Sequence, residues 1–320
     1  MKVLVTSAGS VNGVNVIQTL LNKKYHKSAI EVHAADCDKN SAGLLIADKS
    51  VVFPKVKEPS FKSTLLQYCK VNTIDVVIPT YSEELAFFSN NQEELQVEGL
   101  KFLVSNPRAI EISNSKWKMV DLFKEHSLYQ PRVFNYGHQL KHINYMDFFP
   151  LFMKSAQGSG SKYAHKVEDY DSLVYYLTTI PDPIVQEYIG GEEYTISVFR
   201  TEANTWVLPI ERLKVRGGMS VVCQSVKLSD DLVESIKALA SSLDIKGVAN
   251  FQVKIVEGRP YFIEFNCRFP CGTYPCAIES GMNYPMMILD ALYNNTSSVT
   301  LKYGVKIVRY WNYCIESEGE

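Results

Sequence analysis

Three polar side chains interrupt a hydrophobic stretch, YFIEFNCRF, at residues 261–269. Glu264, Asn266 and Arg268 stand at every second position among aromatic and branched residues that favour a half-buried strand. Because alternate residues of a strand point the same way, a carboxylate, an amide and a guanidinium are expected on one face. Gln252, on the strand expected to pair antiparallel with this one, adds a third side-chain oxygen. Carboxylate and amide oxygens suit Mg²⁺, so the pattern predicts a magnesium- and phosphate-binding face, with the solvated face of an edge strand as the alternative.

A lysine beside a glycine-rich turn forms a second candidate site. Lys154 ends the apolar segment FPLFMK, and SAQGSGSKY follows directly, with Gly158, Ser159 and Gly160 in the turn. Glycine allows close backbone approach, free N–H groups bind oxygen, and the ammonium adds a point charge. This combination predicts phosphate binding without the G-x-x-x-x-G-K-S/T pattern of a Walker A loop. Taken alone, the segment is better explained as a flexible hairpin tip.

The segment VQEYIGGEEYT, residues 185–195, runs from an apolar strand through two glycines to two carboxylates. The end of a strand can offer main-chain N–H and C=O groups to the edge of an adenine ring. A carboxylate a few residues later can accept hydrogen bonds from ribose hydroxyls. The segment therefore fits a nucleotide, although in isolation a plain strand–turn–strand with solvated glutamates is the favoured interpretation.

Two groups of secondary-structure elements are expected to position these residues. Strands and helices alternate with short connections over residues 1–108, which predicts a parallel, doubly wound α/β domain. Tyr81, Glu83 and Glu84 follow the strand IDVVIPT, at the end of the sheet where such folds place ligands. We favour capping of the next helix for these residues, with selection of an amine as the alternative. Beyond residue 108, a hairpin with glycines at its tip and four further strands mixed with helices predict an α+β unit.

Together these motifs resemble the ATP-grasp superfamily, in particular the carbamoyl-phosphate-synthase-like branch of carboxylate–amine ligases. The resemblance covers roughly residues 109–290, and FIEFNCRF is its most specific element. It matches the family pattern E-x-N-P-R, with Cys267 in place of the proline. The resemblance implies an N-terminal α/β domain at 1–108, a small ATP-grasp subdomain with the glycine-rich loop at 109–187, and a C-terminal subdomain with the metal site at 188–320.

The resemblance also implies roles for individual residues, taken over by position. Those residues are Lys154 and Arg268 in catalysis; Lys116, Lys154, Gly158, Ser159 and Gly160 at the phosphates; Glu187, Tyr188 and Ile189 at the adenine; Glu193 at the ribose; and Gln252, Glu264 and Asn266 at the metal. Arg212 and Arg216 are further candidate anion contacts. The implied cofactors are ATP and Mg²⁺, with Mn²⁺ as an alternative ion. The implied reaction activates a small-molecule carboxylate as an acyl phosphate and joins it to an amine.

Other functions remain open. VLVTSAGSVNG followed by Asp36 has the strand, glycine turn, helix and acidic residue of a dinucleotide-dependent oxidoreductase, but not the G-x-G-x-x-G spacing. A non-catalytic ATP-binding protein would carry the same fold. Phosphorylation of carbamate is a further possibility within the ligase class.

Composition limits the class of protein and its partners. The 320 residues are 46% hydrophobic and 21% charged, with a formal net charge of −2. These values are ordinary for a globular protein, and no basic block suggests nucleic-acid binding. No apolar run approaches the roughly 18–20 residues of a membrane span. Seven cysteines without a repeating framework indicate reduced thiols. We therefore expect a cytoplasmic protein, and a homodimer is the commonest form of oligomer.

Overall fold

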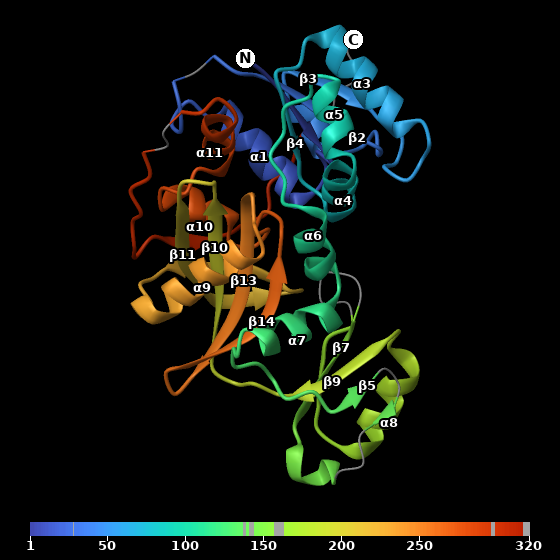
Figure 1. Ribbon diagram of the computed structural model, residues 1–320, viewed down its shortest axis with the longest axis vertical. Helices are drawn as coiled ribbons and strands as arrows, with labels where there is room; N and C mark the ends of the chain where they lie inside the picture. The colour runs from blue at the N-terminus through green and yellow to red at the C-terminus, as the bar shows by residue number, and fades with distance from the viewer. Residues whose placement is uncertain (28, 137–138, 141–143, 157–162, 296–297, 316–320) are drawn as a thin grey trace.

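The computed structural model describes residues 1–27, 29–136, 139–140, 144–156, 163–295 and 298–315. Figure 1 shows a larger upper body that contains the first and the last elements of the chain, and a smaller lobe below it. The lobe holds β7 (Leu151–Ser155), β9 (Pro183–Glu187) and α8 (Tyr170–Thr179).

The N-terminal part is a parallel sheet with helices around it. Its strands are β1 (Lys2–Thr6), β2 (Glu31–Asp36), β3 (Lys49–Val52) and β4 (Val76–Pro79), in the order β3-β2-β1-β4. The connecting helices are α1 (Val11–Leu21), α2 (Ala42–Ile46), α3 (Phe61–Asn72), α4 (Ser82–Asn90) and α5 (Gln92–Val97). β1 is buried almost throughout, as expected for a strand with helices on both faces. The predicted parallel α/β architecture is confirmed.

Two local expectations for this part were wrong. The segment LKFLVSN, residues 100–106, has the apolar composition of a further strand but is not a strand. It runs beside β4 with a backbone bond of 2.9 Å from Val77 N–H to the Lys101 carbonyl, and it does not continue into a ladder. The helix expected over EELAFFSNNQEELQ divides at Asn91, which ends α4 and begins α5.

Two helices lead from this sheet to the rest of the chain. α6 (Pro107–Asn114) was not expected, because Pro107 suggested only a break. Proline is well suited to the first helical position, and the Asn106 side chain caps the helix by accepting from Ala109 N–H. α7 (Lys116–Glu125) follows at the predicted place, with Ser115 as its N-cap.

The smaller lobe has a three-stranded antiparallel sheet in the order β8-β7-β9. Strand β8 (His165–Val167) returns along β7, which confirms the predicted hairpin. Short elements complete the lobe: β5 (Asn135–Tyr136), β6 (Gln139–Leu140) and the 3₁₀ helix η1 (Tyr145–Phe148). The lobe has its own apolar cluster, which includes Phe134, Leu151 and Leu173.

The last part is a six-stranded antiparallel sheet in the order β14-β13-β10-β11-β12-β15. Its strands are β10 (Glu192–Arg200), β11 (Thr205–Arg216), β12 (Met219–Ser225), β13 (Gly247–Val256), β14 (Arg259–Asn266) and β15 (Lys306–Val308). Its helices are α9 (Asp230–Ser242), α10 (Tyr274–Glu279) and α11 (Tyr284–Leu292). Strand β12, strand β15 and helix α10 were not predicted.

The central strands of this sheet have one apolar face. Ile196, Phe251 and Phe265 are fully buried in a cluster that also contains Leu239 of α9 and Phe123 of α7. Since alternate residues of a strand point to opposite faces, the side chains between them lie on the other face. Those side chains form the wall of the candidate site.

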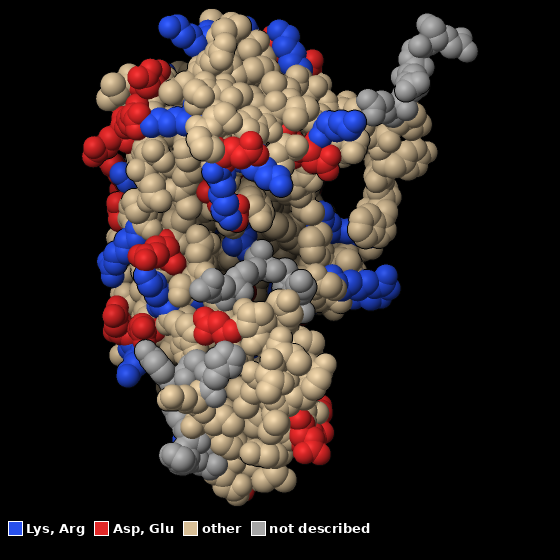
Figure 2. All heavy atoms as spheres, turned by 90° about the vertical axis from the view of Figure 1, so that its right-hand side faces the viewer, with Lys and Arg blue, Asp and Glu red and all other residues tan. Residues whose placement is uncertain are grey.

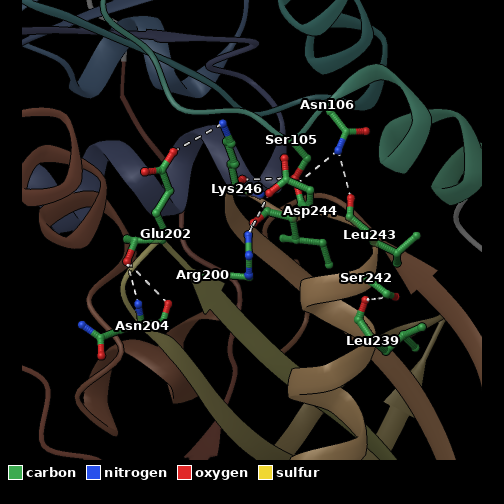
Figure 3. Close-up of polar contacts among 12 residues, drawn as sticks. Ser105, Asn106, Arg200, Glu202, Asn204, Leu239, Ser242, Leu243, Asp244 and Lys246 are labelled. Carbon is green, nitrogen blue, oxygen red and sulfur yellow. Dashed lines mark hydrogen bonds and ion pairs between the residues drawn. The ribbon is translucent and has the colours of Figure 1, made fainter.

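Polar contacts join the exit from the N-terminal sheet to the turn between α9 and β13 (Figure 3). Asn106 Nδ2 donates to the Leu243 carbonyl at 2.9 Å, and Ser105 Oγ donates to the Lys246 carbonyl at 3.1 Å. Arg200, at the end of β10, binds the Ile245 carbonyl at 2.7 Å and Asp244 Oδ1 at 3.1 Å. These bonds hold the N-terminal sheet in a defined position against the six-stranded sheet.

The fold class predicted from the sequence is confirmed: a parallel α/β part is followed by a unit with antiparallel sheets. Each of the three larger sheets is covered by at least one helix that buries an apolar face (Figure 1). In the parts of the chain that the structure describes, no helix combines the length and apolar character needed to cross a bilayer.

Candidate active site

Two rows of polar side chains cross the central strands β10, β13 and β14. In the first row, Thr195 pairs with Gln252, which in turn pairs with Glu264. In the second row, two positions along, Asn250 pairs with Asn266. Directly paired residues of antiparallel strands share a face. The structure thus brings Gln252, Glu264 and Asn266 together on one face, as the spacing predicted.

The strict alternation predicted over residues 261–269 is interrupted by a β-bulge in β14. Gln252 pairs with Glu264, whereas the next residue, Val253, pairs with Phe262, so Ile263 is the extra residue. The bulge leaves Phe262 and Phe265 both buried in the apolar cluster. The carbonyl of Ile263 accepts from Lys154 Nζ at 3.4 Å. The bulge therefore joins the candidate metal strand to the lysine of β7.

Arg268 does not continue the face of β14, which ends at Asn266. It lies in a bend beyond the strand, and its Nη1 donates to Ser82 Oγ at 3.2 Å. The expectation that Arg268 extends the alternation was therefore wrong. The guanidinium points instead toward the first turn of α4, in the N-terminal part of the chain.

Two lysines nevertheless lie near Glu264, and Arg268 lies near one of them. Burial lowers the pKa of Lys154 to about 8, while the charge of Glu264 opposes this shift and that of Lys116 adds to it. Burial also lowers the pKa of Lys116, with Glu264 raising it and Arg268 lowering it further. Electrostatic coupling of this kind requires the two groups of each pair to lie close together. Three positive charges against one negative charge form a site for a polyanion such as the phosphates of a nucleotide.

The donor set fits Mg²⁺. One carboxylate and two amide oxygens are hard ligands, and magnesium takes few ligands from protein and the rest from water and phosphate. The Oδ1 atom of Asn266 is buried and has no hydrogen-bond partner among the described residues, while its Nδ2 contacts Asn250 Oδ1 at 3.4 Å. An orphaned buried oxygen is costly unless a ligand uses it. The described residues contain no cluster of three or more His, Cys, Asp or Glu, in keeping with a set that has a single carboxylate.

The segment predicted to bind adenine lies at the end of β9. Glu187 N–H donates to the Arg132 carbonyl at 2.8 Å, and Arg132 N–H donates to Glu187 Oε2 at 3.2 Å. The ring of the next residue, Tyr188, lies near two lysine ammonium groups. Lys166 Nζ is 4.9 Å and Lys254 Nζ 5.4 Å from the centre of the Tyr188 ring. Ile189 is buried, and its carbonyl accepts from Lys254 Nζ at 2.8 Å. The backbone of this segment is therefore held from the six-stranded sheet.

Glu193 forms an ion pair with Arg212 of the neighbouring strand β11. Arg212 also donates to Ser220 Oγ at 2.8 Å and to the Gly218 carbonyl. The charge of Arg212 is therefore already compensated within the protein, which leaves it less suited to the anion contact that we expected. Arg216 is exposed near the β11–β12 turn. Gly158, Ser159 and Gly160, the predicted phosphate loop, lie outside the described residues.

Figure 2 shows a hollow between the upper body and the smaller lobe, with Lys or Arg side chains inside it. The lobe supplies Lys154 and the adenine segment, and the upper body supplies Lys116, Arg268 and the rows of polar side chains. A site between two such parts can enclose a ligand and exclude water from it.

Family models match both parts of the chain. A model described as "ATP-grasp in the biosynthetic pathway with Ter operon" matches residues 179–312, and one described as "PylC-like, N-terminal domain" matches residues 3–103. The match identifies an ATP-grasp unit in the C-terminal part of the chain. The resemblance inferred from the motifs is thereby confirmed.

A curated relative is a carbamoyl phosphate synthase, in keeping with the carbamoyl-phosphate-synthase-like branch indicated by the motifs. The carbamoyl phosphate synthase large chain of Pseudothermotoga lettingae is 24% identical over 275 residues, which are 80% of this chain and 24% of that protein. The chain thus spans about a quarter of the length of the curated relative that it matches.

Solved structures share the fold of this ATP-grasp protein. The L-amino acid ligase from Bacillus licheniformis has a TM-score of 0.69 at 16% identity, over 91% of this chain and 74% of that one. The biotin carboxylase domain of the 2-oxoglutarate carboxylase from Hydrogenobacter thermophilus, a dimer in complex with MgADP, ADP and bicarbonate, has a TM-score of 0.69 at 16% identity. It covers 95% of this chain and 73% of that one.

Lys254 is a site residue that the sequence reasoning missed. It lies two positions after Gln252 on β13, and it pairs with Glu193 in the sheet register. The same alternation that placed Gln252 could have found it. Its hydrogen bond to the Ile189 carbonyl makes it a positioning residue for the adenine segment of this ATP-grasp protein.

We expect Lys254→Met to raise the KM for ATP about tenfold, with kcat within about twofold of wild type, because a lost hydrogen bond from a charged group weakens ground state and transition state alike. Steady-state ADP release measures both constants. Lys237→Met removes a lysine that is paired with Glu234 on α9, and it is the control. A fall in kcat equal to the fall in kcat/KM would contradict a role limited to the adenine segment.

Proposed function

We propose that the chain is an ATP- and Mg²⁺-dependent carboxylate–amine ligase. The observation that carries this proposal is that Lys116 and Lys154 lie near Glu264, with Arg268 near Lys116, beside the amide oxygens of Gln252 and Asn266. A site for a polyanion beside hard oxygen donors is what phosphoryl transfer from a nucleotide requires. The L-amino acid ligase and the MgADP-bound biotin carboxylase domain with the same fold support it.

The proposed role of each site residue follows from its charge and its hydrogen-bonding groups. Lys116 and Lys154 hold the phosphates, and Arg268 stabilises charge on the group in transfer. Gln252, Glu264 and Asn266 would hold Mg²⁺, or Mn²⁺ in its place, and the ion supplies further positive charge to the phosphates. Glu187, Tyr188 and Ile189 line the adenine through their backbone, and Glu193 accepts from the ribose. Gly158, Ser159 and Gly160 cover the phosphates.

The reaction has two steps. A carboxylate oxygen of the substrate forms a bond to the γ-phosphorus as the bond to ADP breaks. The amine nitrogen then forms a bond to the activated carbonyl carbon, and inorganic phosphate leaves with the electrons of the broken C–O bond. Lysine and arginine side chains lower the repulsion between the attacking carboxylate and the triphosphate.

The wider organisation is part of the same proposal. We place boundaries between the N-terminal domain, the small ATP-grasp subdomain and the C-terminal subdomain at residues 108 and 187. The substrates are small molecules, and the protein acts as a cytoplasmic homodimer. A biotin carboxylase domain of the same fold was solved as a dimer, which supports the last point.

The oxidoreductase alternative finds no support at the first glycine turn. A side chain at Gly13 would come within 2.4 Å of the Ser7 carbonyl, so this glycine serves close packing of α1 against the turn. The Asp36 carboxylate accepts from the N–H groups of Gly9 at 2.7 Å and Asp38 at 2.9 Å. Its oxygens therefore order the loops at the end of the sheet.

An ADP-release screen over pooled carboxylates and amines, with detection of the product by mass, tests the proposal. We expect ADP, phosphate and an amide in equal amounts for at least one pair of substrates. ATP binding without ADP release for any pair would contradict the proposal and support the non-catalytic ATP-binding protein.

A further inference from the structure

Glu84 is a buried carboxylate at the carboxyl edge of the N-terminal sheet. It lies in the first turn of α4, and only 7% of its surface is exposed. Its Oε2 accepts from Thr6 Oγ1, at the end of β1, at 2.6 Å. The sequence favoured helix capping for this residue, whereas the structure turns its carboxylate toward the central strand of the sheet.

No cation of the described residues forms an ion pair with this carboxylate. Burial raises the pKa of Glu84 to about 7, the hydroxyls of Thr6 and Ser7 oppose the shift, and the charge of Asp36 adds to it. The other acidic residue of the first turn, Glu83, is instead exposed and paired with Lys57 at 2.7 Å. A buried carboxylate without a counter-charge gains most from a ligand that carries one.

The first turn of α4 is in contact with the candidate phosphate site. Ser82, two residues before Glu84, accepts from Arg268 Nη1 at 3.2 Å. A second contact joins the same two parts, because Asn12 Nδ2 donates to the Phe269 carbonyl at 3.1 Å. The edge of the N-terminal sheet therefore faces the chain that carries the proposed catalytic arginine.

A second buried acceptor lies along this contact. Asn12 is 3% exposed, and its Oδ1 has no hydrogen-bond partner among the described residues. Asn12 follows the turn after β1, and Thr6, the last residue of β1, donates a hydrogen bond to Glu84. A carboxylate and an orphaned amide oxygen both accept hydrogen bonds, and an ammonium group has three N–H donors and no acceptor.

We propose that Glu84 and Asn12 bind the amine substrate as its ammonium ion, between the N-terminal sheet and Arg268, and that the ammonium gives a proton to the Glu84 carboxylate before its nitrogen attacks the acyl phosphate. The substrate class is thus a primary amine that is protonated at neutral pH, in preference to an uncharged amine. This inference rests on the proposed ligase function. It assigns recognition of the second substrate to the N-terminal part of the chain and of ATP to the rest.

Two nucleophiles separate recognition of the amine from activation of the carboxylate. Hydroxylamine, which is uncharged at neutral pH, traps the acyl phosphate as a hydroxamate. The charged probe is whichever of ammonium, ethanolamine, putrescine and the twenty L-amino acids gives the highest rate with wild type. For Glu84→Gln we expect the KM of the charged probe to rise at least about tenfold, since hydrogen bonds to charged groups are the strong ones. The rate of hydroxamate formation should fall by less than about threefold.

Matched variants keep the test decisive. Glu83→Gln changes the exposed neighbour and should leave the KM of the charged probe within about twofold of wild type. Asn12→Ala, which tests the second acceptor, should raise it by a smaller factor than Glu84→Gln. An unchanged KM in both Glu84→Gln and Asn12→Ala would overturn the inference, as would an equal loss of hydroxamate and amide formation in Glu84→Gln. Wild-type protein that forms no hydroxamate with any carboxylate would overturn the proposed ligase function itself.

Discussion

Replacing Glu264 with alanine is expected to lower kcat/KM for ATP-dependent ADP release about a thousandfold, since a bound metal supplies several kcal/mol of charge stabilisation and about 1.4 kcal/mol is tenfold in rate. Glu264 is the one carboxylate among the three proposed metal ligands, and it pairs directly with Gln252 across β13 and β14. Its removal also leaves Lys116 and Lys154 without the nearby negative charge that favours their ammonium forms. The effect therefore falls on the metal and on the phosphate contacts together.

Isosteric and remote variants serve as controls for Glu264→Ala. Glu264→Gln keeps the shape of the side chain and should lose activity in the same direction, which separates charge from packing. Glu202→Ala removes a glutamate whose side chain is 90% exposed and should behave as wild type. Circular dichroism should show the same fold for all of them. Near-normal ADP release by Glu264→Ala would reject the metal role.

Replacing Lys154 with methionine should lower kcat about a hundredfold, because donors aimed at developing charge in an enclosed site are each worth about this factor. Methionine is unbranched, and it keeps the volume while it removes the ammonium group. Lys118→Met, on the exposed face of α7, removes a lysine paired with Glu111 and is the matched control.

Since burial disfavours the charged form of Lys154, the unliganded Lys154→Met protein should melt at a higher temperature than wild type. A Lys154→Met protein with full activity would contradict the role in catalysis, and one that melts at a lower temperature than wild type would contradict the cost of burying the charge.

The lowered pKa of Lys154 also predicts how nucleotide affinity depends on pH. The ammonium form has a pKa of about 8 in the unliganded protein, and phosphate charge would raise that pKa in the complex. Binding then takes up a proton above pH 8, so the dissociation constant for ADP should rise with pH from that point, by at most about tenfold per pH unit. Calorimetric titrations from pH 7 to pH 9.5 measure this slope. Lys154→Arg, whose charge persists, should show a smaller slope, and an identical slope would assign the effect to another group.

The local pattern of apolar residues predicted those helices and strands well that bury an apolar face of their own. Most of the alternating strands and helices before residue 100, the hairpin of β7 and β8, and the pair β13 and β14 appear at the expected places, whereas α2 was not predicted and one predicted helix divides at Asn91. Apolar periodicity specifies such elements because it is set by burial of one face or two. Strand β15 and helix α10 escaped prediction, since each is short and depends on neighbours that are distant in the chain.

The candidate site divides in the same way. Spacing alone placed Gln252, Glu264 and Asn266 on one face, because the side-chain period of a strand is two residues. The same rule failed for Arg268, since the strand ends at Asn266 and the bend that follows obeys no period. The contact of Lys154 with the Ile263 carbonyl depends on a β-bulge, and no residue type in the stretch predicts that bulge.

The sequence by itself determined the order of the sheets, the chemical types of the groups in the candidate site and the face that three of them share, because these follow from local periodicity. Only the tertiary structure decided that Lys116 and Lys154 lie near Glu264 and Arg268 near Lys116, that Lys254 donates to the Ile189 carbonyl, and that Glu84 turns to β1. Such contacts join residues that are up to about 150 positions apart, as Lys116 and Arg268 are, and they arise from the packing of whole sheets against one another. The charge of a buried group depends on those distant neighbours, so its chemistry is set when the parts of the chain come together.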